Sequence, residues 1–215
     1  MVQKVFIIDD DVAVRDAMGM LLDSEDLPHV GFESADSFLG FYDGNQSGCL
    51  VLDIRMPGMT GLELQKVMSK FQSLLPIIFI TGHGDIPMAV EAMRHGAFDF
   101  LRKPIQEPVL IQRIKQALNV ETNLQSRKLT REKLHDRIDS LTHREFQVFE
   151  EVAQGHANKA IAVTLDISER TVEVHRAQVM KKLATRSIAE VVRIHIEFEL
   201  FKQFRNPPRN LLQKP

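Results

Sequence analysis

Five short apolar runs recur in the first half of the chain, and none of them alternates apolar with polar positions. The runs are Val5–Ile8, Val30–Phe32, Leu50–Leu52, Ile77–Ile80 and Phe98–Leu101. Continuous apolar runs of this length are typical of strands that are covered on both faces. Between them the apolar residues follow a helical spacing. Strand followed by helix, repeated five times, predicts a parallel sheet with helices on both faces and right-handed crossovers.

The helices expected in this half are marked by apolar stripes, each on one face of its helix, although the stripe from Leu62 to Phe71 is looser than the others. The stripes are Val14, Met18, Leu21 and Leu22; Leu62, Val67 and Phe71; Ile86, Val90, Met93 and Ala97; and Leu110, Ile111, Ile114 and Leu118. The last helix is expected to run from about Glu107 through Leu118, where its stripe is the buried face. Pro108 is tolerated in its first turn.

After Leu118 the chain reads "NVETNLQSRKLTREKLHDRID", which lacks Gly and Pro and is rich in helix formers. Its apolar residues do not sustain a heptad, so a coiled coil is unsupported. Residues 121–138 are therefore predicted to be a helical or partly helical linker.

Helical periodicity returns at "SLTHREFQVFEEVAQG", which opens with a capping-box pattern formed by Thr142 and Glu145 and ends at Gly155. A short second helix, "NKAIAVTL", is joined by three residues to a third, "ERTVEVHRAQVMKKLA", with Ser168 as its N-cap. Two short helices joined in this way, the second rich in hydrogen-bond donors, predict a helix-turn-helix. An ordinary helical bundle with a solvated charged face is the alternative.

A long final helix carries two apolar stripes, and the chain then ends in a tail, residues 206–215, that is expected to be disordered. The stripes are Ile188, Val192, Ile196 and Leu200 on one side, and Val191, Ile194, Phe198 and Phe201 on the other. One stripe is expected to pack on the third helix. The other is expected to form a partner surface that helps a dimer to form on DNA, as two-fold proteins reading two half-sites do.

The charge balance separates the two halves. The net charge of −2 combines 10 Lys and Arg against 16 Asp and Glu in residues 1–120 with 17 against 13 in residues 121–215. An acidic first half and a mildly basic second half suggest two domains with different partners. The partner of the second domain is expected to be a polyanion. Cys49 is the only cysteine, and no apolar run approaches the ~18–20 residues of a membrane span. A cytoplasmic protein without a membrane partner is expected, because the chain enters a strand pattern directly without a signal peptide.

Polar residues follow the predicted strands at the edge where open parallel sheets place their sites. They are Asp9, Asp10 and Asp11 after the first strand, Asp53 after the third, Thr81 after the fourth and Lys103 after the fifth. Each has a simpler interpretation: Asp10 or Asp11 could cap the first helix, Thr81 could be a turn residue and Lys103 a solvated charge. Their shared position at one edge favours a single site.

Three carboxylates in one pocket require cations, because two carboxylates ~4 Å apart repel by ~4 kcal/mol at an effective dielectric constant near 20. Lys103 offers one positive charge. Mg²⁺, bound by carboxylate, water and phosphate oxygens, offers the rest, whereas zinc would favour His or Cys. An aspartate beside Mg²⁺ and a lysine can attack a phosphoryl group, and Asp53 is the natural nucleophile.

The motifs "FIIDDD", "LVLDIRMPGMTG", "FITGHGD" and "FLRKP", in this order, resemble the receiver domain of bacterial two-component response regulators over residues 1–120. The resemblance implies an α/β doubly wound, parallel five-stranded sheet with strand order 2-1-3-4-5. It implies that Asp53 accepts a phosphoryl group from a sensor histidine kinase. It also implies Mg²⁺ held by Asp9, Asp10, Asp53 and the backbone carbonyl of Arg55.

The same resemblance assigns roles around the nucleophile. Thr81 would bind a phosphate oxygen, and Lys103 would pair with the phosphoryl group, its peptide bond to the following proline being cis. Phe100 matches the aromatic switch position of the family, and because it lacks the hydroxyl of tyrosine, its switching would depend on packing alone. Arg55 and His83 occupy the variable positions that tune the lifetime of the aspartyl phosphate.

The segment "LTHREFQVFEEVAQGHANKAIAVTLDISERTVEVHRAQVMKKL" resembles the LuxR-type DNA-binding domain, and "TVEVHRAQVMKKL" its FixJ branch. This implies an all-α helix-turn-helix domain over residues 139–205. The residues at positions that read base edges are Glu173, Val174 and Ala177; the candidates for phosphate or sugar contacts are Asn158, Lys159, Thr171, His175, Arg176, Lys181 and Lys182. Glu173 would accept from cytosine N4 or, as the alternative, orient Arg176.

Together these patterns predict a transcription regulator switched by phosphorylation. Its expected partners are a sensor histidine kinase, promoter DNA and a second copy on activation, with RNA polymerase as a further candidate. It is not expected to be an enzyme beyond its own phosphoryl transfer and slow autodephosphorylation, because a phosphohydrolase would need a general acid at position 55, which is arginine. The alternative is a constitutive DNA-binding regulator whose receiver serves only as a dimerisation module.

Overall fold

The structure is a computed structural model that describes residues 2–82 and 86–205. It divides into two compact units between Arg127 and Lys128, each with its own hydrophobic core. None of the described helices is long and apolar enough to cross a membrane. His83 and the tail of residues 206–215, for which disorder was predicted, lie outside the described residues.

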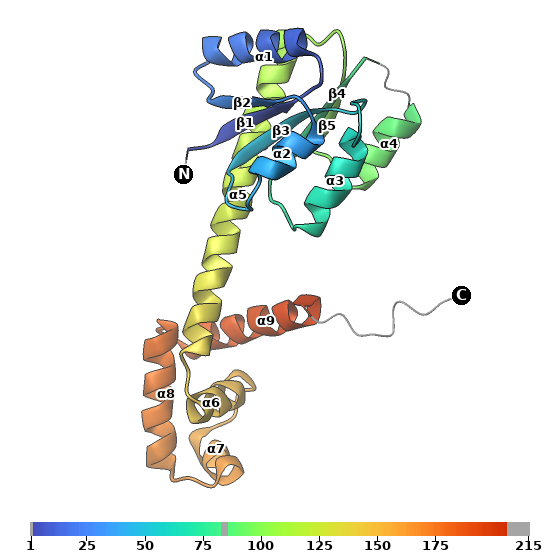
Figure 1. Ribbon diagram of the computed structural model, residues 1–215. Coiled ribbons are helices and arrows are strands. Elements are labelled where there is room, and N and C mark those ends of the chain that lie inside the picture. The colour runs from blue at the N-terminus through green and yellow to red at the C-terminus, as the bar shows by residue number, and fades with distance from the viewer. Residues whose placement is uncertain (1, 83–85, 206–215) are drawn as a thin grey trace, which may run out of the picture. The chain divides into compact units, whose positions relative to one another are not determined.

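The described part of the first unit is built on a sheet of five parallel strands in the order β2-β1-β3-β4-β5 (Figure 1). The strands are β1 (Lys4–Ile8), β2 (His29–Phe32), β3 (Gly48–Asp53), β4 (Ile77–Thr81) and β5 (Asp99–Arg102). Each lies within two residues of a run predicted from the sequence. All of β3 and β4 is buried, as the absence of polar alternation implies. The predicted doubly wound fold and its strand order are confirmed.

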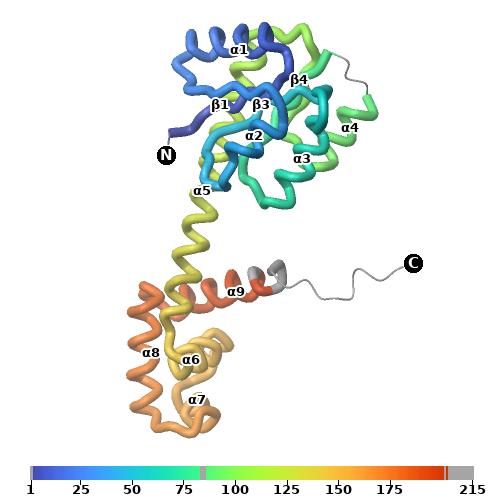
Figure 2. Tube along the Cα trace, in the orientation of Figure 1, coloured from blue at the N-terminus to red at the C-terminus, as the bar shows by residue number. Residues whose placement is uncertain are grey.

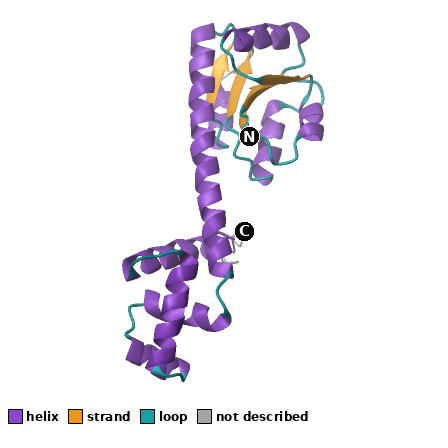
Figure 3. Cartoon of the chain, turned by 90° about the vertical axis from the view of Figure 1, so that its left-hand side faces the viewer, coloured by secondary structure: helices purple, strands orange, loops and turns teal. Residues whose placement is uncertain are grey.

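Helices cover both faces of this sheet, as the view in Figure 3 shows. They are α1 (Val12–Ser24), α2 (Ala35–Phe41), α3 (Gly61–Lys70), α4 (Ile86–Arg94) and the first half of α5 (Glu107–Asp139). One apolar core lies between the sheet and α1 with α5, and includes Met18, Leu22 and Ile114. The other lies on the face covered by α2, α3 and α4, and includes Phe38 and Leu64.

Two of the predicted apolar stripes face the core only in part: Leu62 packs against it and Ala97 is buried in it, but other members do not. In α3 the buried residues are Leu64 and Met68, whereas Phe71 is exposed. In α4 only Ala92 is buried, and Ile86, at the start of the predicted stripe, is 81% exposed. The periodicity of α4 is real, but three residues of its stripe, Ile86, Val90 and Met93, are exposed.

Helix α5 is longer than its apolar stripe predicted. It was expected to end near Leu118, yet it continues without interruption to Asp139, so the predicted linker is helical throughout (Figure 2). Since the segment has neither Gly nor Pro and is rich in helix formers, nothing in its sequence ends the helix.

The described part of the second unit is all helical. Its helices after the end of α5 are α6 (His143–Ala153), α7 (Asn158–Leu165), α8 (Glu169–Leu183) and α9 (Ile188–Arg205). The predicted capping box is present at the start of α6, where Thr142 Oγ1 accepts from the backbone N–H of Glu145 and the Glu145 carboxylate accepts from that of Thr142. Ser168 caps α8 as predicted. The turn between α7 and α8 places Asp166 in the left-handed region, with φ 52°.

Helix α9 packs mainly on α6, not on the third helix as predicted. The ring of Phe198 lies 6.0 Å from that of Phe146, and the ring of His195 lies 5.4 Å from that of Phe149. The stripe that contains Phe198 therefore belongs to the core. The free stripe is the other one, in which Ile188, Ile196 and Leu200 are exposed. The side chain of Phe201 lies outside the described residues.

Candidate functional site

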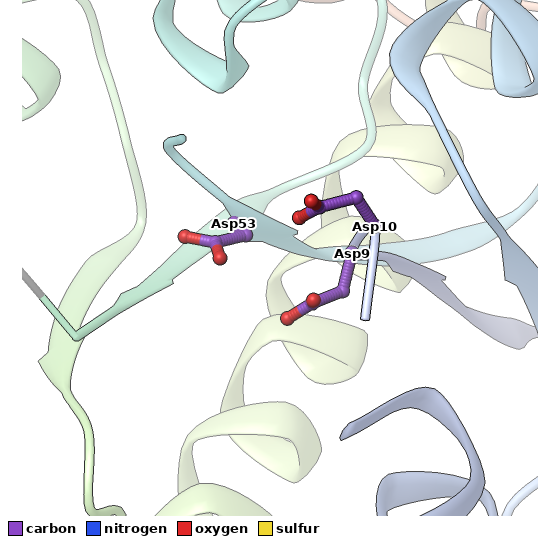
Figure 4. A group of neighbouring side chains, drawn as sticks. All are labelled: Asp9, Asp10 and Asp53. Atoms are coloured by element: carbon purple, nitrogen blue, oxygen red, sulfur yellow. The ribbon is translucent and has the colours of Figure 1, made fainter. Parts of the chain in front are cut away.

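Three carboxylates meet at the carboxyl ends of two neighbouring strands. Asp9 and Asp10 follow β1, and Asp53 is the last residue of β3, whose Leu52 pairs with Ile8 of β1. One oxygen from each carboxylate lies within 4.8 Å of the other two (Figure 4). Asp9 is fully buried and Asp53 is 8% exposed, whereas Asp10 is open to solvent. The predicted convergence of these three residues is present.

Lys103 reaches into this cluster from the end of β5. Its Nζ lies 2.7 Å from Asp9 Oδ2 and 3.3 Å from Asp53 Oδ2. Its backbone N–H donates to the carbonyl of Thr81, and its peptide bond to Pro104 is cis. Burial raises the pKa of Asp9 although Lys103 acts in the opposite direction. Burial alone would lower the pKa of Lys103, but the two carboxylates raise it overall.

The loop after β3 folds back on Asp53 and fixes its side chain. The backbone N–H groups of Ile54 and Arg55 donate to Asp53 Oδ1 at 2.7 and 3.4 Å. The first residue of α3, Gly61, donates its N–H to the carbonyl of Ile54. A Cβ atom at Gly61 would lie 2.3 Å from the carbonyl oxygen of Asp53, so only glycine allows this approach.

The remaining predicted residues of the first unit lie around this cluster. Thr81 ends β4 and is buried. Phe100, on β5, is half-buried and packs against the core on the side of α3 and α4. Asp11 is the N-cap of α1, where its carboxylate accepts from the N–H of Ala13, so the simpler interpretation of this residue is correct. Sequence reasoning missed Arg15, whose Nη1 donates to the carbonyl of Asp9 at 2.7 Å, because its spacing carries no distinctive signal.

The chemistry of these donors suits a hard divalent cation. Every side chain that could coordinate a metal in the cluster is a carboxylate, and the described residues place no His or Cys ligand among them. Oxygen-only sets of this kind are preferred by Mg²⁺ and disfavoured by zinc. One lysine facing three carboxylates leaves the cluster negative, which a divalent cation would correct. The residues present therefore fit Mg²⁺.

In the second unit, α8 turns a polar face to solvent. The predicted base-reading residues Glu173, Val174 and Ala177 are all exposed, and the apolar Val174 is 56% exposed. Lys181 is exposed on the same helix, and Lys159 on α7, while Thr171 and His175 are half-buried. An apolar side chain left in solvent on a polar helix face is compatible with a contact to a thymine methyl group.

Arg176 is held by a residue of the neighbouring helix. Its Nη1 donates to Oδ1 of Asn158, the first residue of α7, at 2.7 Å. This bond links the two helices of the helix-turn-helix across 18 residues of sequence. Asn158 thus occupies the orienting role that the sequence left open for Glu173.

Lys182, predicted to contact DNA, also makes contacts within the second unit. Its Nζ lies 2.6 Å from the buried carboxylate of Glu145 and 2.9 Å from the carbonyl oxygen of Ser140. The ammonium group, with hydrogen bonds from Thr142, lowers the pKa of Glu145. Because this charge is already paired within the unit, Lys182 is a weaker candidate for a phosphate contact than the exposed Lys181.

Comparison with known proteins assigns both units. Residues 5–115 match the model of the response regulator receiver domain, and residues 139–195 match the bacterial regulatory proteins of the luxR family. The chain is 44% identical over 190 residues to the transcriptional regulatory protein FixJ of Bradyrhizobium diazoefficiens, covering 88% of this chain and 93% of that protein. It is 43% identical to the response regulator protein TodT of Pseudomonas putida strain F1, over 88% of this chain and 84% of that one.

Solved structures give the same result. The response regulator StyR matches with a TM-score of 0.84 and 43% identity, over 92% of this chain and all of that one. Full-length FixJ from B. japonicum matches with a TM-score of 0.57 and 42% identity, over 92% of this chain and 98% of that one.

Proposed function

Because this chain belongs to the two-component response regulators that join a receiver domain to a LuxR-type DNA-binding domain, we propose that Asp53 is its phosphoacceptor. The chain is a FixJ-like regulator of transcription, and its receiver implies a sensor kinase as partner. The observation that carries the assignment is the position of Asp53. It is the strand-end carboxylate held by two backbone N–H groups and faced by both Lys103 and Asp9.

In the proposed transfer, a carboxylate oxygen of Asp53 attacks the phosphorus of a phosphohistidine on the kinase. The new O–P bond forms as the P–N bond breaks, and the leaving imidazole keeps the electron pair and takes up a proton. Lys103, already 3.3 Å from Asp53, neutralises charge on the transferring oxygens. Asp9, Asp10, Asp53 and the backbone carbonyl of Arg55 would hold Mg²⁺. When bound, this ion supplies the further positive charge that the phosphoryl oxygens require.

The phosphorylated state is proposed to act through Thr81 and Phe100. A phosphoryl group adds ~−1.5 to −2 charges at the strand edge. Thr81 and Lys103 move towards it, and Phe100 repacks inward from its half-buried position. Shifting a two-state equilibrium from 1:99 to 99:1 requires ~5.5 kcal/mol of differential interaction, a scale that a lysine, a hydroxyl and a divalent cation can supply to a dianion.

The apolar face of α4 is the proposed surface for the homodimer formed on activation. Ile86, Val90 and Met93 are 81%, 43% and 47% exposed there. In the second unit, the free stripe of α9 offers a second contact between copies bound to adjacent half-sites. RNA polymerase remains a candidate partner of the DNA-bound dimer. Because the DNA of a bacterium lies in the cytoplasm, we propose that this regulator acts there.

Sequence-specific binding is proposed to use the exposed face of α8. Glu173, Val174 and Ala177 lie where base edges are read, and Arg176, oriented by Asn158, contacts phosphate. The remaining proposed phosphate or sugar contacts come from Asn158, Lys159, Thr171, His175, Lys181 and, more weakly, Lys182.

Slow autodephosphorylation is proposed in place of an enzymatic phosphatase. The residue two positions after Asp53 is Arg55, whose side chain is exposed and cannot act as a general acid at neutral pH.

The test is promoter binding with and without a small-molecule phosphodonor. Asp53→Asn keeps the size of the side chain but removes its nucleophilicity, so we expect it to abolish the response to the phosphodonor. Asp16→Asn, on the exposed face of α1, is the matched control and should respond as the natural chain does. A full response in Asp53→Asn would contradict the assignment. A natural chain that binds equally in both conditions would instead favour the constitutive regulator.

A further inference from the structure

Glu121, the first residue of the segment predicted to be linker, is buried against the receiver. It is 1% exposed, while its helix neighbours Val120, Thr122 and Asn123 are exposed. A glutamate in a surface helix normally extends into solvent. This one points inward at the amino-terminal edge of the sheet, which is the edge opposite to Asp53.

Two segments far away in the sequence hold this carboxylate. Gln3, just before β1, donates its amide N–H to Glu121 Oε2 at 2.7 Å. Ser47, just before β3, donates its hydroxyl to the same oxygen at 3.1 Å. The Gln3 amide also bonds to the Leu118 carbonyl oxygen at 2.9 Å and to Thr122 Oγ1 at 3.1 Å. One turn of α5 is therefore attached to the starts of the two central strands.

Among the described residues, the Glu121 carboxylate lacks the cationic partner that a stabilising buried charge would have. Its hydrogen-bond donors are a neutral amide and a hydroxyl, and among the described residues no cation pairs with it. Its second oxygen, Oε1, is buried and accepts no hydrogen bond from those residues. Burial, with the nearby charge of Glu121, raises the pKa of the Cys49 thiol to about 12. Burying a carboxylate without a cationic partner costs free energy, so its presence is not explained by stability. One known use of buried polar groups is to select a single geometry.

We propose that Glu121 is a positioning residue that fixes the point at which α5 leaves the receiver. The polar attachment makes the helix from Glu107 to Thr122 part of the receiver. If α5 is displaced on phosphorylation, this whole stretch therefore moves together, and the linker moves with it. This inference rests on the proposed function, because it concerns how the phosphorylation signal leaves the receiver.

The first measurement concerns the attachment itself and does not depend on function. Glu121→Gln, in the full chain, replaces the carboxylate by an amide of the same shape. Amide hydrogen exchange over residues 118–126 should accelerate by about tenfold, as the loss of one charge-assisted hydrogen bond from the closed state implies. Glu132→Gln is the matched control on the same helix, since Glu132 is exposed, and it should leave exchange over residues 118–126 unchanged.

The second measurement concerns signal transmission. The gain in promoter affinity caused by a phosphodonor should fall about fivefold in Glu121→Gln, within the usual range of allosteric coupling. The rate of Asp53 phosphorylation should stay within about twofold of that of the natural chain, because the two sites lie at opposite edges of the sheet. Gln3→Ala removes the main hydrogen-bond donor to Glu121 and is the variant to use if Glu121→Gln fails to fold. It should show the same faster exchange and the same smaller phosphodonor response.

The outcomes separate the two proposals. Unchanged hydrogen exchange would overturn the attachment, and faster exchange with an undiminished phosphodonor response would overturn its role in signalling. A natural chain that is phosphorylated but does not change its DNA affinity would contradict the proposed function and the signalling role together. The exchange result would still decide whether Glu121 holds α5.

Discussion

Asp53→Asn should make the metal-free receiver more stable, although it removes the residue on which the proposed function depends. Two carboxylates at 4.8 Å, the upper limit of the oxygen separations in the cluster, repel by ~3.5 kcal/mol at an effective dielectric constant of 20. Asp53 faces two such neighbours and one attractive partner, Lys103 at 3.3 Å, whose attraction is ~5 kcal/mol on the same scale. The repulsions exceed the attraction by ~2 kcal/mol. Because Asp10 is exposed and screened, we expect a gain of ~1 kcal/mol in unfolding free energy.

Mg²⁺ should reverse the order of stability of Asp53→Asn and the natural chain. A ligand present at 100 times its dissociation constant stabilises the folded state by ~2.7 kcal/mol. The natural chain should gain about this amount, and Asp53→Asn clearly less, because one charged ligand is lost. The variant is thus expected to be the more stable protein in EDTA and the less stable one in saturating Mg²⁺.

Urea unfolding followed by tyrosine fluorescence measures this difference for the receiver alone. The chain has no tryptophan and a single tyrosine, Tyr42, whose ring lies 5.7 Å from that of Phe38 in the receiver core. Its signal therefore reports the first unit even when the two units unfold separately. A variant that is no more stable than the natural chain in EDTA, or that gains as much from Mg²⁺, would refute the electrostatic account of the cluster.

Three further outcomes are expected. Arg176→Ala should weaken promoter binding and reduce the salt dependence of log K by about one phosphate contact, measured by titration at several salt concentrations. Lys182 lowers the pKa of Glu145. The stabilisation that this ion pair gives the second unit should therefore be complete above pH 4.5 and be lost as the pH falls through the lowered pKa. A Lys182→Met variant should show a smaller loss of stability in acid, measured as urea midpoints followed by circular dichroism. Gly61→Ala should destabilise the receiver by ~3 kcal/mol or more, because its Cβ would collide with the Asp53 carbonyl; a natural urea midpoint would contradict that collision.

The strands and the acidic cluster could be predicted because both follow from the same constraint. An apolar run without alternation must be covered on both faces, and strands covered in this way lie parallel, with their carboxyl ends at one edge. Asp9, Asp53 and Lys103 therefore had to meet once the strands were assigned. The residues that hold Asp53 in place, such as Gly61, could not be predicted in the same way. Their role depends on a close approach between two backbone segments, which the apolar pattern does not show.

Helix faces were predicted less well, since periodicity shows which residues share a face but not what covers it. The stripe of α4 has an ideal spacing, yet Ile86, Val90 and Met93 are exposed. In α3 the buried apolar residues are Leu64 and Met68, whereas Leu62 of the predicted stripe is only partly buried. The pairs of Arg176 with Asn158 and of Lys182 with Glu145 join different helices 18 and 37 residues apart, a separation at which helical spacing carries no information.

Helix α5 connects the two buried polar sites of the receiver. It begins four residues after Lys103, which holds the acidic cluster at one edge of the sheet, and it is attached through Glu121 at the other edge. The helix between Glu107 and Glu121 rises ~21 Å, and its inner face, including Ile114 and Ala117, is fully buried. A packed helix of this length moves as a body, because its core contacts do not deform continuously. Movement of Lys103 towards a phosphoryl group would therefore reach the linker along α5 more directly than through the sheet, whose strands are all hydrogen-bonded to their neighbours.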